Sequence, residues 1–515
     1  MSALVPKVTR ELTRMKRTLR ATFGLDKLRP GQAEVMRHVL EGSNTLAIMP
    51  TGAGKSLCYQ LPTLHLPGTT VIVSPLISLM KDQHDKLEDA GLDASQLNSA
   101  LTAREHQENL TEIKKKESDF VFVTPERFVT EEFLRELRKQ AIDFVVIDEA
   151  HCISEWGHDF RPAYLSLGAA IKTLGSPPVL ALTATATTEV ILDIEKQLDL
   201  GKLRVVNTGI YRPNIHFEVK RVTNEREKHE ELIRVLQESD GCGIIYCATV
   251  KTVEALADWL KGFDFKIEKY HGRMKASDRK NNQEAFMAGE LKAIVATNAF
   301  GMGIDKADIR FVVHYQMPGS LEAYYQEAGR AGRDGAPATC SLLYQLDDRR
   351  TQQFFLGGKH PKFDDILAIY QALETLGAAT TPVTLSTVQE HANTVTDGRV
   401  RVVLSLLKEM KLVQELRGSR FHLLRVDIKR AELEALARLS EQKVEKDKEK
   451  LQLMMQYGQS PKCRWRLLHD YFSEEMEEEQ CGTCDNCIHP LEEPIVVVKS
   501  AAKEYSLITR IPQTT

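Results

Sequence analysis

The chain has 515 residues, of which 42% are hydrophobic and 27% are charged, and its formal net charge is −4 at pH 7. These values are ordinary for globular protein, and the length predicts about three to four domains. The acidic balance excludes binding to nucleic acid through overall positive charge, so contacts with phosphate backbones must come from local basic grooves. No apolar stretch approaches the ~20 residues of a membrane span. We therefore expect a cytoplasmic protein without membrane contact.

The first predicted domain spans residues 1–207 and has an α/β pattern. Short apolar runs alternate with amphipathic helical stretches, and the runs are TLAIM, TVIVS, FVFVT, FVVID and VLALT. This alternation is typical of βαβ units around a parallel sheet that is buried on both faces.

A glycine-rich segment, MPTGAGKS, follows the first of these runs and precedes a helical stretch. Strand, glycine-rich loop and helix form the context that a phosphate loop requires, although Met49 stands where the usual pattern begins with glycine. Lys55 is predicted to reach the β- and γ-phosphates and Ser56 to ligate Mg²⁺. The alternative is a glycine loop that arose by chance. The predicted nucleotide contacts in this segment are Thr51, Gly52, Ala53, Gly54, Lys55 and Ser56.

Two adjacent carboxylates, Asp148 and Glu149, end the apolar run FVVID and begin the segment DEAHCISEWGHDFRPAY. In a protein with a phosphate loop, Asp148 is predicted to hold Mg²⁺ and Glu149 to orient and deprotonate the attacking water. The alternative interpretation is an acidic residue that caps a helix after a strand. The two motifs together predict a nucleotide hydrolase.

The same segment places the large rings of Trp156 and Phe160, followed by Arg161, among polar residues. Aromatic faces stack on unpaired bases, at about 1–3 kcal/mol per base. A base that stacks here, one loop away from the predicted Mg²⁺ site, could move the catalytic carboxylates. The alternative is that both rings pack in a core between domains.

The second predicted domain spans residues 208–355 and repeats the α/β pattern with the runs GIIYC, KIEKY, AIVAT, RFVVHY and CSLLY. A cleft between two such domains is the default ligand site. The segment QEAGRAGRDG is predicted to follow a helix, and Arg330 and Arg333, three residues apart, are expected to point into the cleft from one helical face. An arginine that stabilises γ-phosphate charge is worth ~10³–10⁵ in rate. The alternative is a cluster of surface charges.

The C-terminal part is predicted to contain a winged-helix-like domain at 356–428 and a helical zinc-binding module at 429–490. Three helical stretches precede the β-pair VQELRGSRFHLL, which turns at Gly418. That order is typical of a winged helix, and a helical accessory domain without a ligand is the alternative. Residues 491–515 form a tail without a recognisable domain.

Four of the nine cysteines lie close together in the segment CRWRLLHDYFSEEMEEEQCGTCDNC. Four thiolates at this spacing suit tetrahedral Zn²⁺, and His469 and His489 are possible competing ligands. No reacting group converges on the cluster, so the predicted site is closed and structural. The predicted ligands are Cys463, Cys481, Cys484 and Cys487.

With these motifs, the chain resembles the RecQ family of DNA helicases in helicase superfamily 2, over about residues 20–355 and again over 445–489. The segments SPLISLMKDQ, VTPERF and TATA resemble the family's strand-tracking and coupling motifs, and QEAGRAGRDG resembles motif VI, which adds Gln326 to the catalytic set. FGLDKLRPGQ resembles the adenine-reading motif, which makes Arg29 and Gln32 nucleotide contacts. The resemblance implies two tandem RecA-like domains. The family's DNA-coupling loop corresponds to Ser154, Trp156, His158, Phe160 and Arg161.

The chain departs from the family pattern in three places. Leu25 occupies a position that is usually aromatic, the winged-helix-like segment precedes the zinc cysteines, and no C-terminal helical nucleic-acid domain is expected. The hairpin that splits duplex DNA in the family therefore does not carry over to residues 414–424.

The resemblance implies an ATP- and Mg²⁺-dependent DNA helicase that moves 3′ to 5′ on single-stranded DNA and acts in recombination and repair. The expected substrates are single-stranded and tailed duplex DNA, and the protein is expected to be associated with the nucleoid if it is bacterial. The expected state is a monomer that works with a single-stranded-DNA-binding protein. The alternatives are a translocase that remodels DNA without separating strands, an RNA helicase, and a DNA-binding regulator with an inactive ATPase fold.

Overall fold

The computed structural model describes residues 4–98, 101, 103–115, 118–154, 161–301, 304–359, 361–416 and 419–490. The chain divides into two compact units. The larger unit comprises Met1–Gln316, Glu322–Leu343 and Gln459–Thr515, and the smaller unit comprises Met317–Leu321 and Tyr344–Gly458. The predicted domain boundaries at 355/356 and 428/429 stay predictions.

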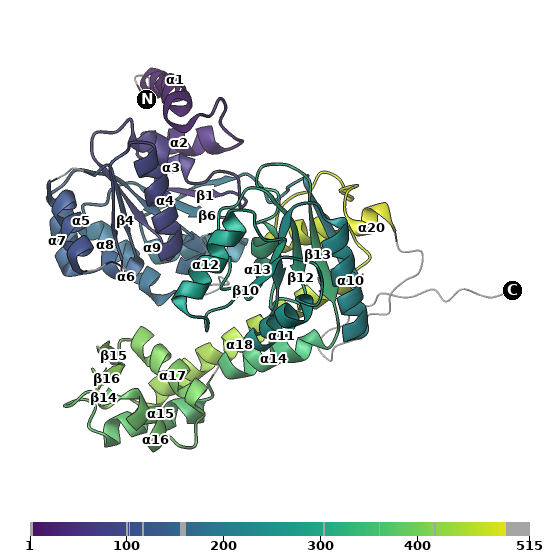
Figure 1. Cartoon of the computed structure of the whole chain (residues 1–515). Helices are drawn as coiled ribbons and strands as arrows, with labels where there is room; N and C mark the ends of the chain where they lie inside the picture. The colour runs from purple at the N-terminus through teal and green to yellow at the C-terminus, as the bar shows by residue number, and fades with distance from the viewer. Residues whose placement is uncertain are drawn as a thin grey trace. The chain divides into compact units, whose positions relative to one another are not determined.

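The first lobe of the larger unit is built on a parallel seven-stranded sheet in the order β3-β4-β2-β5-β6-β1-β7 (Figure 1). Its strands are β1 (Thr45–Ile48), β2 (Thr69–Val73), β3 (Ala94–Leu97), β4 (Phe120–Val123), β5 (Ile142–Ile147), β6 (Val179–Thr183) and β7 (Arg204–Asn207). Successive residues of a strand serve opposite faces, so Val71 and Val73 join one core while Ile72 joins the other. Burial on both faces explains why these strands read as continuous apolar runs.

Helices cover both faces of this sheet (Figure 1). The helices α5 (Ala103–Lys115), α6 (Pro125–Phe128), α7 (Glu131–Leu137), α8 (Leu167–Thr173) and α9 (Thr188–Leu198) contribute to one core. The helices α2 (Gln32–Leu40), α3 (Leu57–Thr63) and α4 (Ile77–Asp89) contribute to the other. Helix α1 (Leu4–Phe23) packs on α2 and α3, and two short 3₁₀ helices, η1 (Ala150–Ile153) and η2 (Pro162–Ser166), follow β5.

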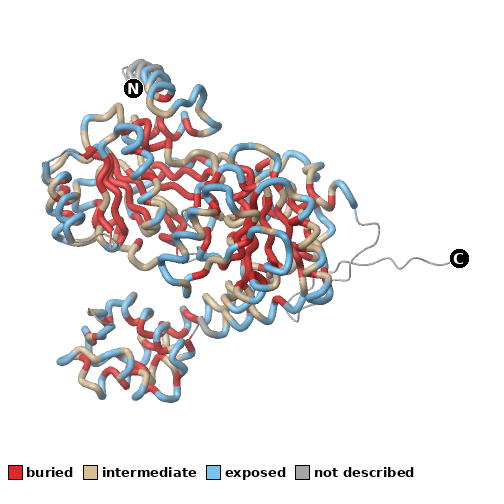
Figure 2. The backbone as a smooth tube through the Cα atoms, viewed as in Figure 1, coloured by how far each residue is buried: buried red, intermediate tan, exposed pale blue. Residues whose placement is uncertain are grey.

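The second lobe contains a six-stranded sheet in the order β10-β11-β9-β12-β13-β8. Its strands are β8 (Ile215–Arg221), β9 (Cys242–Tyr246), β10 (Ile267–Tyr270), β11 (Ala293–Ala296), β12 (Ile309–His314) and β13 (Ala338–Tyr344). The accompanying helices are α10 (Glu225–Glu238), α11 (Val250–Leu260), α12 (Ala276–Met287) and α13 (Leu321–Ala328). In both lobes the central strands of the sheet are deeply buried (Figure 2), whereas the edge strand β7 is mostly exposed. The predicted α/β fold class with two successive sheets is confirmed, whereas the predicted domain bounds 1–207 and 208–355 stay predictions.

The smaller unit has the predicted order of helices followed by a β-hairpin. It contains α14 (Asp348–Lys359), α15 (Phe363–Thr375), α16 (Leu385–His391), α17 (Asp397–Glu409), most of α18 (Arg430–Gln459), and the strands β14 (Val383–Thr384), β15 (Val413–Leu416) and β16 (Arg420–Leu423). The antiparallel order is β14-β16-β15, and the sequence did not predict β14. The turn residue Gly418 lies outside the described residues.

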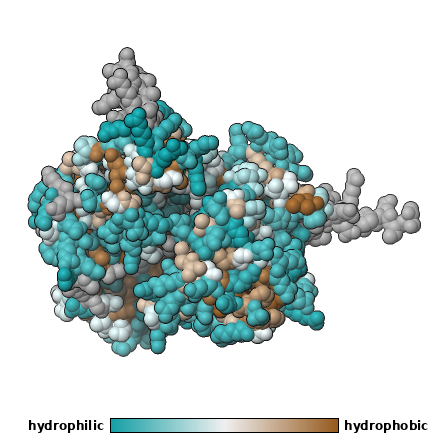
Figure 3. Space-filling view, turned by 45° about the horizontal axis from the view of Figure 1, so that its top comes forward, coloured by the Kyte–Doolittle hydropathy of each residue, from teal (hydrophilic) through white to brown (hydrophobic). Residues whose placement is uncertain are grey.

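The remaining helices, α19 (Arg464–Phe472) and α20 (Asp485–Ile488), flank the cysteine cluster and contact β8 of the second lobe. On the face shown in Figure 3 the surface is mostly hydrophilic, and hydrophobic residues form small separate groups. Among the described residues, no helix combines the length and the apolar character needed to span a bilayer. The tail 491–515 lies outside the described residues.

Candidate active site and metal centre

The phosphate-loop segment connects β1 to α3 and turns through glycines that no other residue could replace easily. Gly52 and Gly54 have φ of 85° and 80°, in the left-handed region that favours glycine. A Cβ on Gly54 would lie 2.6 Å from Gln32 Nε2. Gln32 Nε2 donates to the carbonyls of Ala53 (3.1 Å) and Gly54 (2.9 Å), and the Arg29 guanidinium donates to the carbonyl of Gly52. The two predicted adenine contacts therefore hold the backbone of the loop.

Lys55 points into the cleft from this loop, and its Nζ donates to the carbonyl of Met49 at 3.0 Å. Burial lowers the pKa of Lys55, and the carboxylates of Glu149 and Asp148 partly oppose that shift. The side chain of Met49 is fully buried, and its sulfur lies 3.9 Å from that of Cys58. Met49 thus fills the core with its side chain and offers only its carbonyl to the loop, so the missing first glycine does not obstruct the turn.

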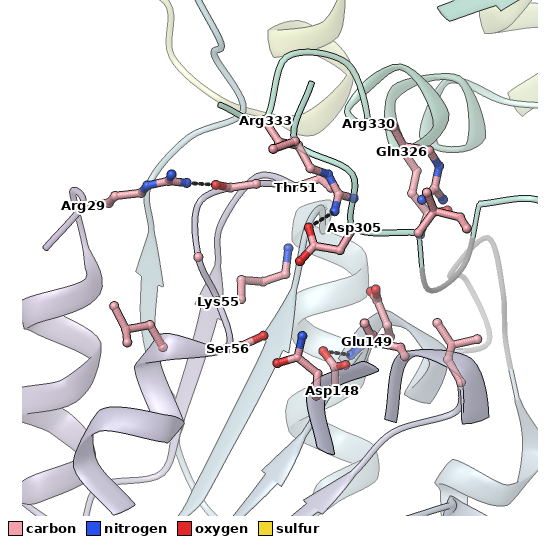
Figure 4. A pocket seen from close by; sticks show the side chains of 18 of the residues that line it. Arg29, Thr51, Lys55, Ser56, Asp148, Glu149, Asp305, Gln326, Arg330 and Arg333 are labelled. Atoms are coloured by element: carbon pink, nitrogen blue, oxygen red, sulfur yellow. Dashed lines mark hydrogen bonds and ion pairs between the residues drawn. The ribbon is translucent and has the colours of Figure 1, made fainter. Parts of the chain in front are cut away.

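The two carboxylates emerge at the carboxyl end of β5 and face the loop (Figure 4). Asp148 Oδ1 accepts a hydrogen bond from the backbone N–H of Glu149 (3.0 Å), and Oδ2 accepts one from Ser74 Oγ (3.3 Å). Burial, and then the charge of Glu149, raise the pKa of Asp148 to about 7, while Lys55 opposes the shift. Glu149 has φ 49°, and its buried Oε2 lies 3.4 Å from His151 Nδ1.

The second lobe contributes Arg330 and Arg333, which follow α13 in turns, so the prediction that they share one helical face is wrong. Arg330 donates to the carbonyl of Gly301, and Arg333 donates to Asp305 Oδ1 at 2.6 Å. Asp305 Oδ2 accepts from Lys86 of the first lobe at 3.0 Å. Burial alone would raise the pKa of Asp305, but the charges of Arg333 and Lys86 outweigh it and lower that pKa. An ion-paired chain thus joins the two lobes at the cleft.

The cleft has a volume of about 390 Å³, and Figure 4 shows the side chains that point into it from both lobes. Leu25, at the position that is usually aromatic in the family, also lines it and is 44% exposed. The sequence did not single out Lys86 or Asp305, because neither a lone lysine nor a lone aspartate carries a chemical signal of its own. The predicted site residues that line the cleft are Arg29, Gln32, Thr51, Gly52, Gly54, Lys55, Ser56, Asp148, Glu149, Gln326, Arg330 and Arg333.

The predicted aromatic loop is only partly described. Trp156, His158 and Phe160 lie outside the described residues. At its start, Ser154 Oγ donates to Asp193 Oδ2 of α9 at 2.7 Å. At its end, Arg161 donates to the carbonyl of Pro75 at 3.1 Å.

That arginine contact places the end of the loop close to Asp148 and Glu149. Pro75 directly follows Ser74, whose hydroxyl bonds to Asp148. A movement of Arg161 can therefore reach Asp148 through two adjacent residues.

The four clustered cysteines form a metal-binding group. Their Sγ atoms all lie within 4.8 Å of one another, and three of the separations are 3.4, 3.9 and 4.0 Å. A tetrahedral site with Zn–S bonds of ~2.3 Å requires sulfurs about 3.8 Å apart. Backbone N–H groups of Cys481, Cys484 and Arg464 donate to three of the sulfurs, as suits thiolate ligands. The residues therefore fit Zn²⁺, and within the described part of the chain no histidine joins the group.

Residues 459–490, the zinc module of the larger unit, pack on the second lobe through polar and aromatic contacts. Asp485 Oδ2 accepts from the backbone N–H of Val219 in β8 at 2.8 Å, and its Oδ1 pairs with the buried Arg464. The fully buried Trp465 packs edge-to-face against Phe217, with 4.9 Å between ring centroids. Folding of the zinc module and packing of the second lobe are thus linked.

Three family models match the chain. They are the DEAD/DEAH box helicase model at residues 29–194, the helicase conserved C-terminal domain at 227–335 and the RecQ zinc-binding model at 425–488. The fold, the cleft and these matches define a two-lobed phosphate-loop protein of the helicase class, with a zinc-binding site made of four cysteines.

Comparison with curated relatives shows which family of helicases the chain belongs to. ATP-dependent DNA helicase RecQ of Bacillus subtilis (strain 168) is 46% identical over 347 residues, which are 67% of this chain and 58% of that protein. The probable ATP-dependent DNA helicase RecS of the same organism is 41% identical over 365 residues, which are 70% of this chain and 73% of that protein. The chain belongs to the RecQ family of ATP-dependent DNA helicases. Its match spans less than two thirds of the length of the B. subtilis RecQ protein.

Solved structures are similar in fold. The DUF1998 helicase MrfA bound to DNA has 20% identity and a TM-score of 0.54, with 81% of this chain and 60% of that chain covered. Mss116p bound to single-stranded RNA and AMP-PNP has 20% identity and a TM-score of 0.53, with 67% and 74% covered. At this identity the likeness concerns the fold alone.

Proposed function

We propose that the chain is an ATP- and Mg²⁺-dependent DNA helicase that moves 3′ to 5′ on single-stranded DNA and unwinds tailed duplexes in recombination and repair. The observation that carries this proposal is the meeting of Lys55, Asp148, Glu149 and Arg333 in one cleft between two lobes. Phosphoryl transfer depends mainly on positioning and on electrostatic stabilisation, and charged groups from both lobes supply them here.

The nucleotide would lie with its phosphates on the Gly52–Ser56 backbone. The N–H groups of that turn face the phosphates, and Lys55 neutralises charge on the β- and γ-phosphates. Ser56 and Asp148 would hold Mg²⁺, which supplies charge neutralisation at the β- and γ-oxygens when it is bound. Glu149 Oε2 is buried at the cleft, 3.4 Å from His151 Nδ1, and we propose that this carboxylate orients the attacking water.

The adenine contacts are proposed to come from the segment that precedes α2. Arg29 and Gln32 line the cleft while they also hold the phosphate loop, so base recognition at these residues would act directly on the phosphate site. Leu25 would pack on the base without aromatic stacking.

Coupling of hydrolysis to DNA is proposed for the loop from Ser154 to Arg161. The contact between Arg161 and Pro75, next to the hydrogen bond between Ser74 and Asp148, supports this role. We propose that single-stranded DNA is the activator, that a single-stranded-DNA-binding protein is a partner, and that a monomer acts on chromosomal DNA in the cytoplasm.

Strand separation on 3′-tailed, 5′-tailed and blunt duplexes, with ATP and Mg²⁺, tests the proposal. We expect unwinding of the 3′-tailed duplex alone, and loss of that activity in Lys55→Ala, which cannot neutralise the phosphates. If no duplex is unwound while DNA still stimulates hydrolysis, the chain is a translocase or remodeller instead.

Trp156→Ala is expected to leave hydrolysis without DNA near the wild-type rate and to remove most of the stimulation by single-stranded DNA. The reason is that stacking contributes ~1–3 kcal/mol per base, and the variant loses the ring but none of the cleft residues. Steady-state ATPase rates with and without a poly-dT oligonucleotide measure the effect. Equal losses under both conditions would disprove a role in coupling.

A further inference from the structure

The linker between the two lobes, residues 208–214, contains a buried arginine. Its side chain contacts backbone carbonyls that lie beside the nucleotide site in both lobes. Arg212 is 9% exposed and lies between β7 and β8. Its guanidinium donates to the carbonyls of Gly329 (2.8 Å), Ala331 (2.8 Å) and Gly332, all in the second lobe. It also donates to the carbonyl of Thr51, in the phosphate loop, at 3.4 Å.

The three acceptors in the second lobe are neighbours of the two arginines in the cleft. Gly329 precedes Arg330, and Gly332 precedes Arg333. A planar guanidinium offers five donors spread over three nitrogens in a fixed geometry, so one side chain can hold a backbone loop at several carbonyls, whereas an ammonium has three donors on a single nitrogen. The direction in which Arg333 leaves the loop therefore depends on Arg212.

The two lobes approach closely at this point. A Cβ on Gly52 would lie 3.1 Å from Arg333 Cγ, and a Cβ on Gly329 would lie 3.3 Å from Thr51 Cβ. Glycine at positions 52 and 329 permits this approach, and Arg212 connects the two backbones.

The start of the linker is fastened by the zinc module. Glu474 directly follows Ser473, the residue that caps the end of α19, and only 8% of its side chain is exposed. Its Oε2 accepts from the backbone N–H of Ile210 at 2.8 Å, and its Oε1 accepts from Asn207 Nδ2 at 3.2 Å. The Tyr325 hydroxyl of α13 donates to the carbonyl of Ile210 at 2.6 Å.

An aromatic contact holds the next residue of the linker. The Tyr211 ring packs edge-to-face against Trp465 of the zinc module, with 5.0 Å between centroids. Residues 210–212 are therefore held on one side by the zinc module and on the other by the Gly329–Arg333 loop.

We infer that Arg212 is a positioning residue for ATP hydrolysis, because it holds the Gly329–Arg333 loop against the phosphate loop. Glu474 in turn fixes the start of the linker to which Arg212 belongs. The zinc module then contributes to the geometry of the ATPase site as well as to folding. This inference rests on the proposed helicase function.

The test compares Arg212→Lys with Arg204→Lys, a control on β7 whose guanidinium contacts the carboxylate of Glu41. We expect Arg212→Lys to lower kcat for DNA-stimulated hydrolysis by ~10–100-fold, since small misplacements of catalytic groups cost about that much. The Kd for ADP should stay within about threefold, because Lys55 and the phosphate loop are intact. Arg204→Lys should match the wild type in both.

A double-mutant cycle separates positioning from a general structural role. If Arg212 acts through Arg333, then Arg212→Lys should cost less than about threefold in kcat when Arg333 is already alanine. An equal fold-loss in both backgrounds would overturn the inference.

Amide hydrogen exchange of residues 326–336 in the nucleotide-free protein tests the contact between Arg212 and the Gly329–Arg333 loop independently of catalysis. We expect faster exchange there in Arg212→Lys, by about tenfold, and no change in Arg204→Lys. Unchanged exchange in Arg212→Lys would overturn the inference. If exchange rises but the wild type shows no DNA-stimulated hydrolysis, the positioning contact stands and the helicase proposal fails.

Glu474→Gln tests the zinc-module contact, with the exposed Glu477→Gln as control. In glutamine, the amide NH₂ group replaces one of the carboxylate oxygens and faces either Asn207 Nδ2 or the backbone N–H of Ile210. Because both of these groups are donors, one of the two hydrogen bonds to the linker is lost. We expect kcat to fall by about 3–10-fold while the zinc content remains that of the wild type. Wild-type kcat in Glu474→Gln would overturn the role assigned to this residue.

Discussion

Arg333→Ala is expected to lower kcat for DNA-stimulated ATP hydrolysis by ~10³-fold or more, since an arginine on the transferring phosphoryl group is worth ~10³–10⁵ in nucleotide hydrolases. The residue follows α13 in the second lobe, but its Cγ lies against Gly52 of the phosphate loop. Burial is the largest cause that lowers the pKa of Arg333, the neighbouring Arg330 lowers it further, and Asp305 opposes the shift. A guanidinium stays charged despite such shifts, so the cation is available to the phosphate.

The measurement is a set of steady-state rates at saturating single-stranded DNA, together with nucleotide affinity. Affinity for ADP should stay within about threefold, because the β-phosphate contacts come from Lys55 and the loop. Arg333→Lys should recover only part of the rate, since an ammonium lacks the planar fork. Arg234→Ala is the control, because Arg234 pairs with Glu231 and Glu238 of its own helix, α10. A kcat within tenfold of the wild type would remove Arg333 from the catalytic set.

Cys484→Ser is expected to abolish zinc binding and to unfold the zinc module. Cys484 is fully buried, and its Sγ lies 3.4 Å from Cys487 Sγ and 4.0 Å from Cys463 Sγ. Structural zinc contributes ~10–16 kcal/mol of apparent binding free energy in small zinc peptides, which is lost together with the fold that the metal supports. Because Trp465 is buried against the second lobe, its release should also lower solubility.

Zinc stoichiometry and the thermal unfolding midpoint measure this effect. Cys242→Ser is the matched control, because Cys242 is a buried thiol of β9 that bonds to the carbonyl of Asp308, and serine can keep that bond. The control should retain full zinc content. A stable, zinc-free and fully active Cys484→Ser protein would show that the cluster has no structural role.

The motifs that the sequence predicted well are those whose chemistry lies within a short stretch of chain. Four cysteines within 25 residues can meet around one ion with little help from the rest of the fold, and their sulfurs do meet. The phosphate loop is equally local, since its conformation follows from glycines between a strand and a helix. Apolar runs likewise predicted both parallel sheets, because strands buried on two faces carry no alternation.

What the sequence could not determine depends on which distant segments meet. Met49 looked like a defect of the phosphate loop, but the fold buries its side chain and uses its carbonyl to hold Lys55. Asp305 and Lys86 are 219 residues apart, and no sequence motif links them, yet their ion pair joins the two lobes. Gln32 was expected only as a nucleotide contact, and the fold also makes it a support of the loop.

By itself, the sequence determined the chemistry of this protein: a phosphate loop, a carboxylate pair, an arginine segment and four zinc-binding thiols. Only the tertiary structure decided the arrangement that makes these parts act together. Arg212 and Glu474 carry no motif, and their importance comes from backbone carbonyls and amides that every residue has. A backbone group gains a particular role only where the fold places a side chain beside it, and residue identity along the chain does not encode that placement locally.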